Sequence, residues 1–206
     1  MSKPATYFIH DEKQLAALAA AARQEIVDVL AEMGTVSVAE LAATLGRPAD
    51  ALYFHLRRLT QVGLVRHAGH RMRGGRKEAL YHTVAPELML EYEPDNSSNT
   101  KGVSAIVGSM LRLGVRDFRC ALERGDALVS GQKRELWALR KTGRLSLAQI
   151  AKVNRSIKRL IGSARNPRGT GRLYAVTILL TPLDRRRNSA SAATPKRTAK
   201  ARGNKR

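Results

Sequence analysis

Residues 41–69 read LAATLGRPADALYFHLRRLTQVGLVRHAG, and this stretch decides the fold that the sequence predicts. It opens inside a short predicted helix over residues 38–45 and then turns at residues 46–48. Pro48 suits the position just before a helix or its first residue, because its fixed φ and missing N–H cost nothing there. We therefore predict a second helix over residues 49–62, directly after the turn.

The predicted helix over residues 49–62 has two chemically distinct faces. At about 100° per residue, Leu52, Leu56 and Leu59 fall on one stripe that is typical of a core-facing side, and His55 at its flank is interpreted as a packing residue. A helix divided in this way can lie in the major groove of DNA, where arginine grips guanine edges or phosphates and aromatic rings meet thymine methyl groups. The side chains on the other side are Asp50, Tyr53, Phe54, Arg57, Arg58 and Gln61.

The flanking segments complete the pattern of a winged helix-turn-helix. Residues 12–33 repeat apolar side chains every three or four positions, which predicts one long amphipathic helix ended by Gly34. Residues 64–70 and 78–84 are predicted strands of a hairpin, the wing, with a glycine-containing tip between them. We expect the basic residues of the tip to reach flanking phosphates or the minor groove. They are Arg71, Arg73, Arg76 and Lys77.

The distribution of charge singles out the same region. Residues 1–46 carry three basic and six acidic side chains, and residues 78–100 carry no basic and five acidic ones. Residues 47–77, in contrast, hold eight basic side chains and one acidic one. The whole chain has a formal net charge of +20, which indicates a polyanionic partner. A basic segment between two acidic ones indicates one binding face, and nucleic acid is the favoured partner.

Residues 41–69 resemble the helix-turn-helix and first wing strand of the ArsR-like winged-helix regulators. Members of that group often show Leu-Tyr-x-His-Leu-x-x-Leu followed by Gly-Leu-Val, and residues 52–65 fit this pattern. The resemblance covers roughly residues 12–90 and implies a homodimer that binds double-stranded DNA. Metal-sensing members carry cysteine-rich or His and carboxylate ligand patterns, whereas residues 38–45 contain no Cys or His. We therefore expect no metal and no cofactor. The residues leave open whether a small-molecule effector binds.

After the wing, the sequence predicts a linker and then a mainly helical region. Residues 91–101 (EYEPDNSSNTK) are polar and turn-rich, which is typical of a linker. Residues 102–184 resemble, more weakly, the C-terminal dimerisation or effector regions of some ArsR-like regulators. In this region we expect helices over residues 101–124 (or a pair broken at Gly108 and Gly114), 132–141 and 146–163, the last with Ser146 and Gln149 as a capping box, and a buried strand over residues 173–180.

The last segment, residues 185–206, carries nine basic side chains and no acidic one. It cannot bury enough apolar surface to fold alone, so we predict a disordered basic tail. The predicted fold class is mainly α with a small β wing. A winged helix-turn-helix domain over residues 12–90 is followed by a helical C-terminal region with one strand.

These patterns favour a dimeric regulator of transcription that binds a specific sequence of double-stranded DNA. No Ser/His/Asp or paired-carboxylate arrangement stands out, so we expect no enzymatic activity. An alternative is a nucleoid-associated or RNA-binding protein without strong sequence preference, because residues 101–184 hold 17 basic and five acidic side chains. Another is a winged-helix module whose basic face binds an acidic protein.

The expected location is the cytosol, in association with the nucleoid. The first residues lack the basic head and apolar core of a signal peptide, and no apolar run reaches the roughly 20 residues that a membrane span needs. We therefore expect no membrane partner. The single cysteine, Cys120, excludes an intramolecular disulfide.

Overall fold

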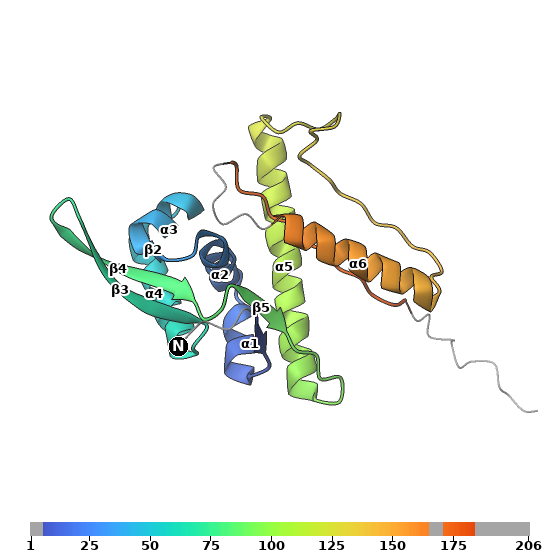
Figure 1. The fold of residues 1–206 in the computed structure, drawn as a ribbon, viewed down its shortest axis with the longest axis horizontal. Coiled ribbons are helices and arrows are strands. Elements are labelled where there is room, and N and C mark those ends of the chain that lie inside the picture. Colours follow the sequence, from blue (N-terminus) through green and yellow to red (C-terminus); the bar gives the residue numbers. More distant parts are fainter. Residues whose placement is uncertain (1–5, 165–170, 184–206) are drawn as a thin grey trace, which may run out of the picture.

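The computed structural model describes residues 6–164 and 171–183 (Figure 1). Short helices and strands up to residue 90 are followed by two longer helices. In chain order the elements are β1 (Thr6–Ile9), α1 (Glu12–Leu18), α2 (Ala21–Met33), β2 (Val36–Ser37), α3 (Val38–Leu45), α4 (Ala49–Gln61), β3 (Val65–Arg73), β4 (Arg76–Thr83), β5 (Glu87–Leu90), α5 (Ser97–Arg124) and α6 (Leu147–Ala164).

Helices α2, α3 and α4 share one apolar core. The predicted leucine stripe of α4 belongs to it, since Leu52, Leu56 and Leu59 are at most 1% exposed. Ile26 of α2 and Leu41 of α3 are buried to the same degree in the same cluster. Burying one such side chain contributes roughly 1.5–3 kcal/mol, so this cluster fixes the three helices relative to one another.

Local signals set the ends of α3 and the start of α4. A capping box begins α3: the Ser37 hydroxyl accepts from the N–H of Glu40 at 3.3 Å, and the Glu40 carboxylate accepts from the N–H of Ser37 at 2.9 Å. Gly46 ends α3 in the left-handed conformation, with φ of +61°. Pro48 then precedes α4 in an extended conformation. The predicted helix, turn and helix are therefore found within one residue of their expected bounds.

The predicted long helix over residues 12–33 is wrong, because the chain forms two helices. It leaves helical geometry at Ala20, with φ of −92° and ψ of 122°. The Arg23 guanidinium donates to the carbonyls of Ala16 and Ala17, groups that the end of a helix leaves without intrahelical partners. The spacing of apolar residues continues across the break, because α1 and α2 each bury one side. The spacing alone therefore does not reveal the change in chain direction.

Strands β3 and β4 form an antiparallel hairpin, and β2 pairs with the outer side of β4. Gly74 and Gly75 make the two-residue turn with positive φ, as tight hairpins require. The strands are longer than predicted. Arg71, Arg73, Arg76 and Lys77 therefore lie on paired strands, in register with each other or with neighbours, and not in an open loop. Ladder hydrogen bonds fix where these side chains point.

A parallel pair of strands, β1 and β5, lies outside the sequence-based expectations. Helix α5 follows and runs unbroken through Gly108 and Gly114. It begins at Ser97, inside the segment predicted as a linker, because Asn96 caps it by accepting from the N–H groups of Ser98 and Asn99. A Cβ on Gly102 would lie 2.9 Å from Leu15 Cβ, so a glycine allows the close approach of α5 to α1.

Helix α6 has the predicted capping box, in which Ser146 and Gln149 exchange hydrogen bonds of 3.3 and 2.8 Å. None of its residues is buried. The predicted helix over residues 132–141 is wrong: Trp137 and Leu139 are 65% and 83% exposed, and a short helix without packing is not stable. The predicted strand over residues 173–180 is also wrong, since no strand pairs with it.

The predicted basic tail over residues 185–206 lies outside the described residues. Among the helices that the structure does describe, none combines the length and the apolar character needed to cross a membrane.

Candidate nucleic-acid interface

The surface of α4 opposite its leucine stripe is open to solvent. All six side chains predicted for this surface are exposed: Asp50, Tyr53, Phe54, Arg57, Arg58 and Gln61. Of the two aromatic rings on this surface, Phe54 is the more exposed, at 69%, and Tyr53 is 49% exposed. Two arginines beside two exposed rings are suited to contacts with the edges and backbone of a nucleic acid duplex.

Part of this surface continues onto the hairpin. Tyr53, Arg57 and Gln61 of α4 line an open groove of about 360 Å³ together with Thr60 and with His67 and Tyr81 of the hairpin. The rings of His67 and Tyr81 meet edge to face at 5.5 Å. The sequence patterns did not identify Thr60 of α4, or His67 and Tyr81 of the hairpin, as site residues. The hairpin is bulged between His67 and His70, where Gly69 has a positive φ.

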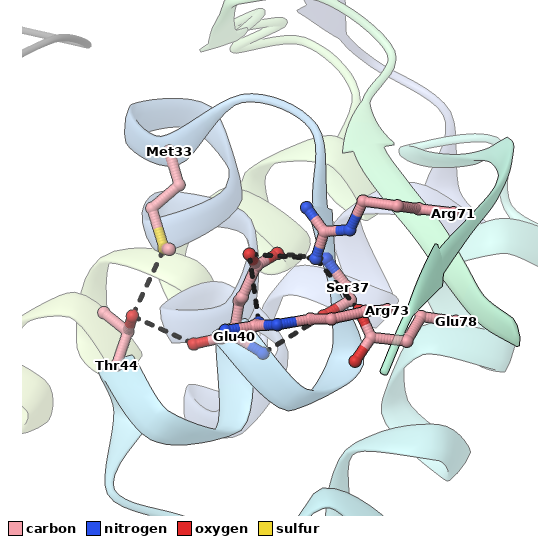
Figure 2. Close-up of polar contacts among 7 residues, drawn as sticks. All are labelled: Met33, Ser37, Glu40, Thr44, Arg71, Arg73 and Glu78. Atoms are coloured by element: carbon pink, nitrogen blue, oxygen red, sulfur yellow. Dashed lines mark hydrogen bonds and ion pairs between the residues drawn. The ribbon is translucent and has the colours of Figure 1, made fainter. Parts of the chain in front are cut away.

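Arg71 differs from the other predicted wing residues, because it is held by two carboxylates (Figure 2). Its Nη2 atom lies 3.0 Å from Oε1 of Glu40 in α3 and 2.9 Å from Oε2 of Glu78 in β4. The hydrogen bonds to Glu78 and Glu40 raise the pKa of Arg71. Arg71 therefore ties the hairpin to the capped start of α3, and this use competes with a contact to phosphate.

Glu40 is the centre of this cluster. Besides capping α3 and binding Arg71, it lies 3.7 Å from Nη1 of Arg73. Its pKa is lowered, mainly by the hydrogen bond from the Ser37 backbone and further by Arg71. The Thr44 hydroxyl, one turn on, lies within hydrogen-bonding distance of the Glu40 carbonyl, at 3.0 Å, and of the Met33 sulfur, at 3.4 Å, so it bridges α3 and α2 (Figure 2).

The tip of the hairpin presents basic side chains to solvent. Arg73 and Arg76 flank the Gly74-Gly75 turn, Lys77 is next along β4, and all three are exposed. In an antiparallel pair, residues directly opposite each other share a face. Arg73, Arg76 and Arg71 therefore lie on the face that meets α3, whereas Lys77 lies on the other with Met72.

His55 sits at the edge of the core, where the sequence placed it. Its Nδ1 atom is buried without a hydrogen-bond partner in the described residues. Burial, with the nearby charges of Arg23 and Arg47, lowers the pKa of His55. Both effects favour the neutral form of the half-buried imidazole, and its ring meets the Phe54 ring edge to face at 5.5 Å between centroids.

The histidines of the hairpin do not gather into one site. The rings of His67 and His70 are 4.7 Å apart, whereas Nδ1 of His82 contacts the Thr83 carbonyl at 2.7 Å. Across residues 6–164 and 171–183, no group of three or more His, Cys, Asp or Glu side chains is placed to hold a metal ion.

Comparison with known families matches residues 18–68 to a model described as a helix-turn-helix domain. The matched range runs from the end of α1 through α4 into β3, so it contains the turn at residues 46–48 and the exposed face of α4. Residues 18–68 are a helix-turn-helix domain. No curated protein matches the chain.

The helix-turn-helix domain explains why α4 is exposed on one side. In such domains the second helix of the motif is the one that can enter a DNA groove, and α3 and α4 are the first and second helices of the motif here. The domain indicates DNA as a partner and favours a role in transcription regulation. Most of the hairpin, α5 and α6 lie outside the matched range.

Proposed function

We propose that this chain is a regulator of transcription that binds a specific sequence of double-stranded DNA through a winged helix-turn-helix of the ArsR-like type. The observation that carries the proposal is the division of α4. Its three leucines are buried, while six polar, basic and aromatic side chains face solvent beside a basic hairpin. A helix that served only to pack against the core would need only the buried leucines. The outer face is suited to base edges.

In this proposal, α4 lies in the major groove and the hairpin is the wing. Arg57 and Gln61 border the groove that α4 forms with the hairpin, so they are the candidates for base contacts. Arg73, Arg76 and Lys77 contact flanking phosphates, which fix the register without reading sequence. Arg71 holds the wing against α3, since Glu40 and Glu78 already neutralise its charge.

We further propose that the protein acts as a homodimer. Of 23 large apolar side chains exposed in the described residues, 17 lie within residues 111–183. On α5, Leu111, Val115, Phe118 and Leu122 follow spacings of four, three and four residues, the pattern of a helix that pairs along one seam. Leu111, Val115 and Leu122 of this row are exposed and Phe118 is half-buried, so an apolar row along α5 is open to a second copy.

The position of this surface suits a dimer on DNA. Figure 1 shows the hairpin at one end of the long axis of the molecule, α5 across the middle and α6 toward the other end. A second copy bound along α5 would leave both α4 helices open. Two recognition helices then read half-sites about one helical turn, roughly 34–36 Å, apart.

A second candidate is a basic protein that binds nucleic acid without sequence preference. Helix α6 supports it, because Lys152, Arg155, Lys158 and Arg159 share one side and α6 has no acidic residue. Titration separates the two candidates when full-length protein is tested against three probes: a duplex that it selects from a random pool, a random duplex and single-stranded RNA. A regulator prefers the selected duplex by about 10³-fold or more. Equal binding to all three supports the second candidate and contradicts the regulator.

A further inference from the structure

Glu25 of α2 brings together two arginines from distant parts of the chain. Its Oε2 atom lies 2.5 Å from Nη2 of Arg47, in the turn between α3 and α4. Its Oε1 atom lies 2.6 Å from Nη2 of Arg116, in the middle of α5. The Glu25 side chain is 17% exposed. One carboxylate thus joins the region before the recognition helix to the helix that carries the proposed dimer seam.

Both contacts of Glu25 are strong for physical reasons. Hydrogen bonds between charged groups are shorter and stronger than neutral ones, and removing one partner leaves the other charge uncompensated in a partly buried site. Arg116 is also fixed by its neighbour Asp117, whose Oδ1 atom lies 2.6 Å from the same Nη2. The hydrogen bond to Glu25 is the main cause of a raised pKa for Arg116.

Arg47 lies in the turn between α3 and α4, so its position affects the direction in which α4 begins. Its N–H donates to the Ala42 carbonyl at 3.0 Å, which closes α3, and Pro48 follows directly. The first bond of the next helix runs from the N–H of Ala51 to the Pro48 carbonyl at 3.2 Å. Holding the Arg47 side chain therefore restrains both the end of α3 and the entry into α4.

We propose that Glu25 is a positioning residue that makes the placement of α4 depend on the position of α5. The contact with Arg116 ties the position of Glu25 to that of α5. The contact of the other Glu25 oxygen with Arg47 ties the start of α4 to Glu25. A second copy that shifts α5 thereby shifts the surface offered to DNA. The inference rests on the proposed function only for its DNA readout, because the link between α5 and the turn exists without DNA.

The first test measures amide hydrogen exchange in full-length protein. Arg116→Gln removes the α5 contact but leaves Glu25 paired with Arg47. Its matched control is Arg119→Gln, which removes the same charge one turn along α5, from an exposed pair with Glu123. In Arg116→Gln we expect the amide exchange rates at Arg47 and Ala51 to rise about three- to tenfold, which corresponds to the coupling energies usual between contacting residues. In the control Arg119→Gln these rates should stay unchanged.

Arg116→Lys keeps a cation within reach of Glu25 and perturbs the fold less, so exchange in this variant is expected to lie between the wild type and Arg116→Gln. This variant decides the question even if Arg116→Gln does not fold. Equal exchange at Arg47 and Ala51 in wild type, Arg116→Lys and Arg119→Gln overturns the inference.

The second test compares binding to a selected duplex and a random duplex. Arg116→Gln is expected to reduce the preference for the selected duplex by about three- to tenfold, whereas Arg119→Gln, with the same net charge, leaves it unchanged. A residue that only stabilises the fold would not alter this ratio well below the unfolding temperature. If the wild type shows no preference, the proposed function fails, and the exchange experiment still decides the role of Glu25.

Discussion

Arg71 of β3 and Glu40 of α3 are joined by an ion pair of 3.0 Å, so the hairpin and the start of α3 are fixed to each other. This relationship changes the interpretation of the wing. From sequence, Arg71 is one of four basic residues available for phosphate. In the folded chain Arg71 ties the hairpin to α3, whereas Arg73, Arg76 and Lys77 further along the hairpin are exposed.

The first prediction concerns this tie. Arg71→Gln should lower the free energy of unfolding only slightly, because the pairs are partly exposed and screened by solvent. Arg66→Gln, which removes the same charge from an exposed position of the same strand, should change it less. Urea unfolding of both single variants, of Glu40→Gln and of the double variant measures the coupling. Strictly additive losses for Arg71 and Glu40 would show that the pair contributes nothing.

The second prediction concerns pH. Burial and the charges of Arg23 and Arg47 lower the pKa of His55, so near pH 6.5 the unfolded chain binds a proton that the folded chain does not yet bind. The stability from neutral His55 is therefore present above the unfolded pKa and is lost as the pH falls below it. Asp28, whose pKa burial raises to about 6, contributes with the opposite sign, so the prediction is a difference between variants: between pH 7.5 and 5.5 the urea midpoint of wild type should drop relative to that of His55→Gln. The exposed His10 is the control, and a fall of the same size in His55→Gln and His10→Gln would contradict this assignment.

The third prediction concerns assembly. Wild-type protein should sediment as a dimer at micromolar concentration, and Val115→Asp should sediment as a monomer because a carboxylate in the apolar seam of α5 loses its hydration on pairing. Tyr92→Asp is a matched control, since Tyr92 is 70% exposed and Val115 is 69% exposed. A wild-type monomer that still binds its selected duplex as a monomer would contradict the proposed dimer.

The sequence predicted the helix-turn-helix well because its signals are local. The leucine spacing of α4 and the Gly46-Pro48 turn each specify their own neighbourhood, and their effects agree. The capping box of α6 was predicted for the same reason. The exposed side of α4 then follows from geometry, since three buried leucines determine the opposite face.

Several errors share a physical origin, which is that apolar patterns do not show which partner a segment meets. Leu136, Trp137 and Leu139 have helical spacing, but Trp137 contacts the Arg134 guanidinium at 4.5 Å and no helix forms. Likewise, the pairing of β1 with β5 joins residues about 80 positions apart, which neither strand indicates alone. The ion pairs of Arg71 and Glu25 also depend on tertiary contacts.

Binding of Arg57→Gln tests the role of α4 in reading sequence most directly. Arg57 is exposed on the groove side of α4, and a bidentate contact of arginine to guanine contributes about 1–3 kcal/mol of discrimination. Affinities of wild type, Arg57→Gln and the charge-matched Arg119→Gln are measured on a selected and on a random duplex at one salt concentration. We expect Arg57→Gln to lose about 1–3 kcal/mol on the selected duplex and much less on the random one, with small and equal losses on both for Arg119→Gln. Equal losses on the two duplexes for Arg57→Gln would contradict sequence readout by this residue of α4.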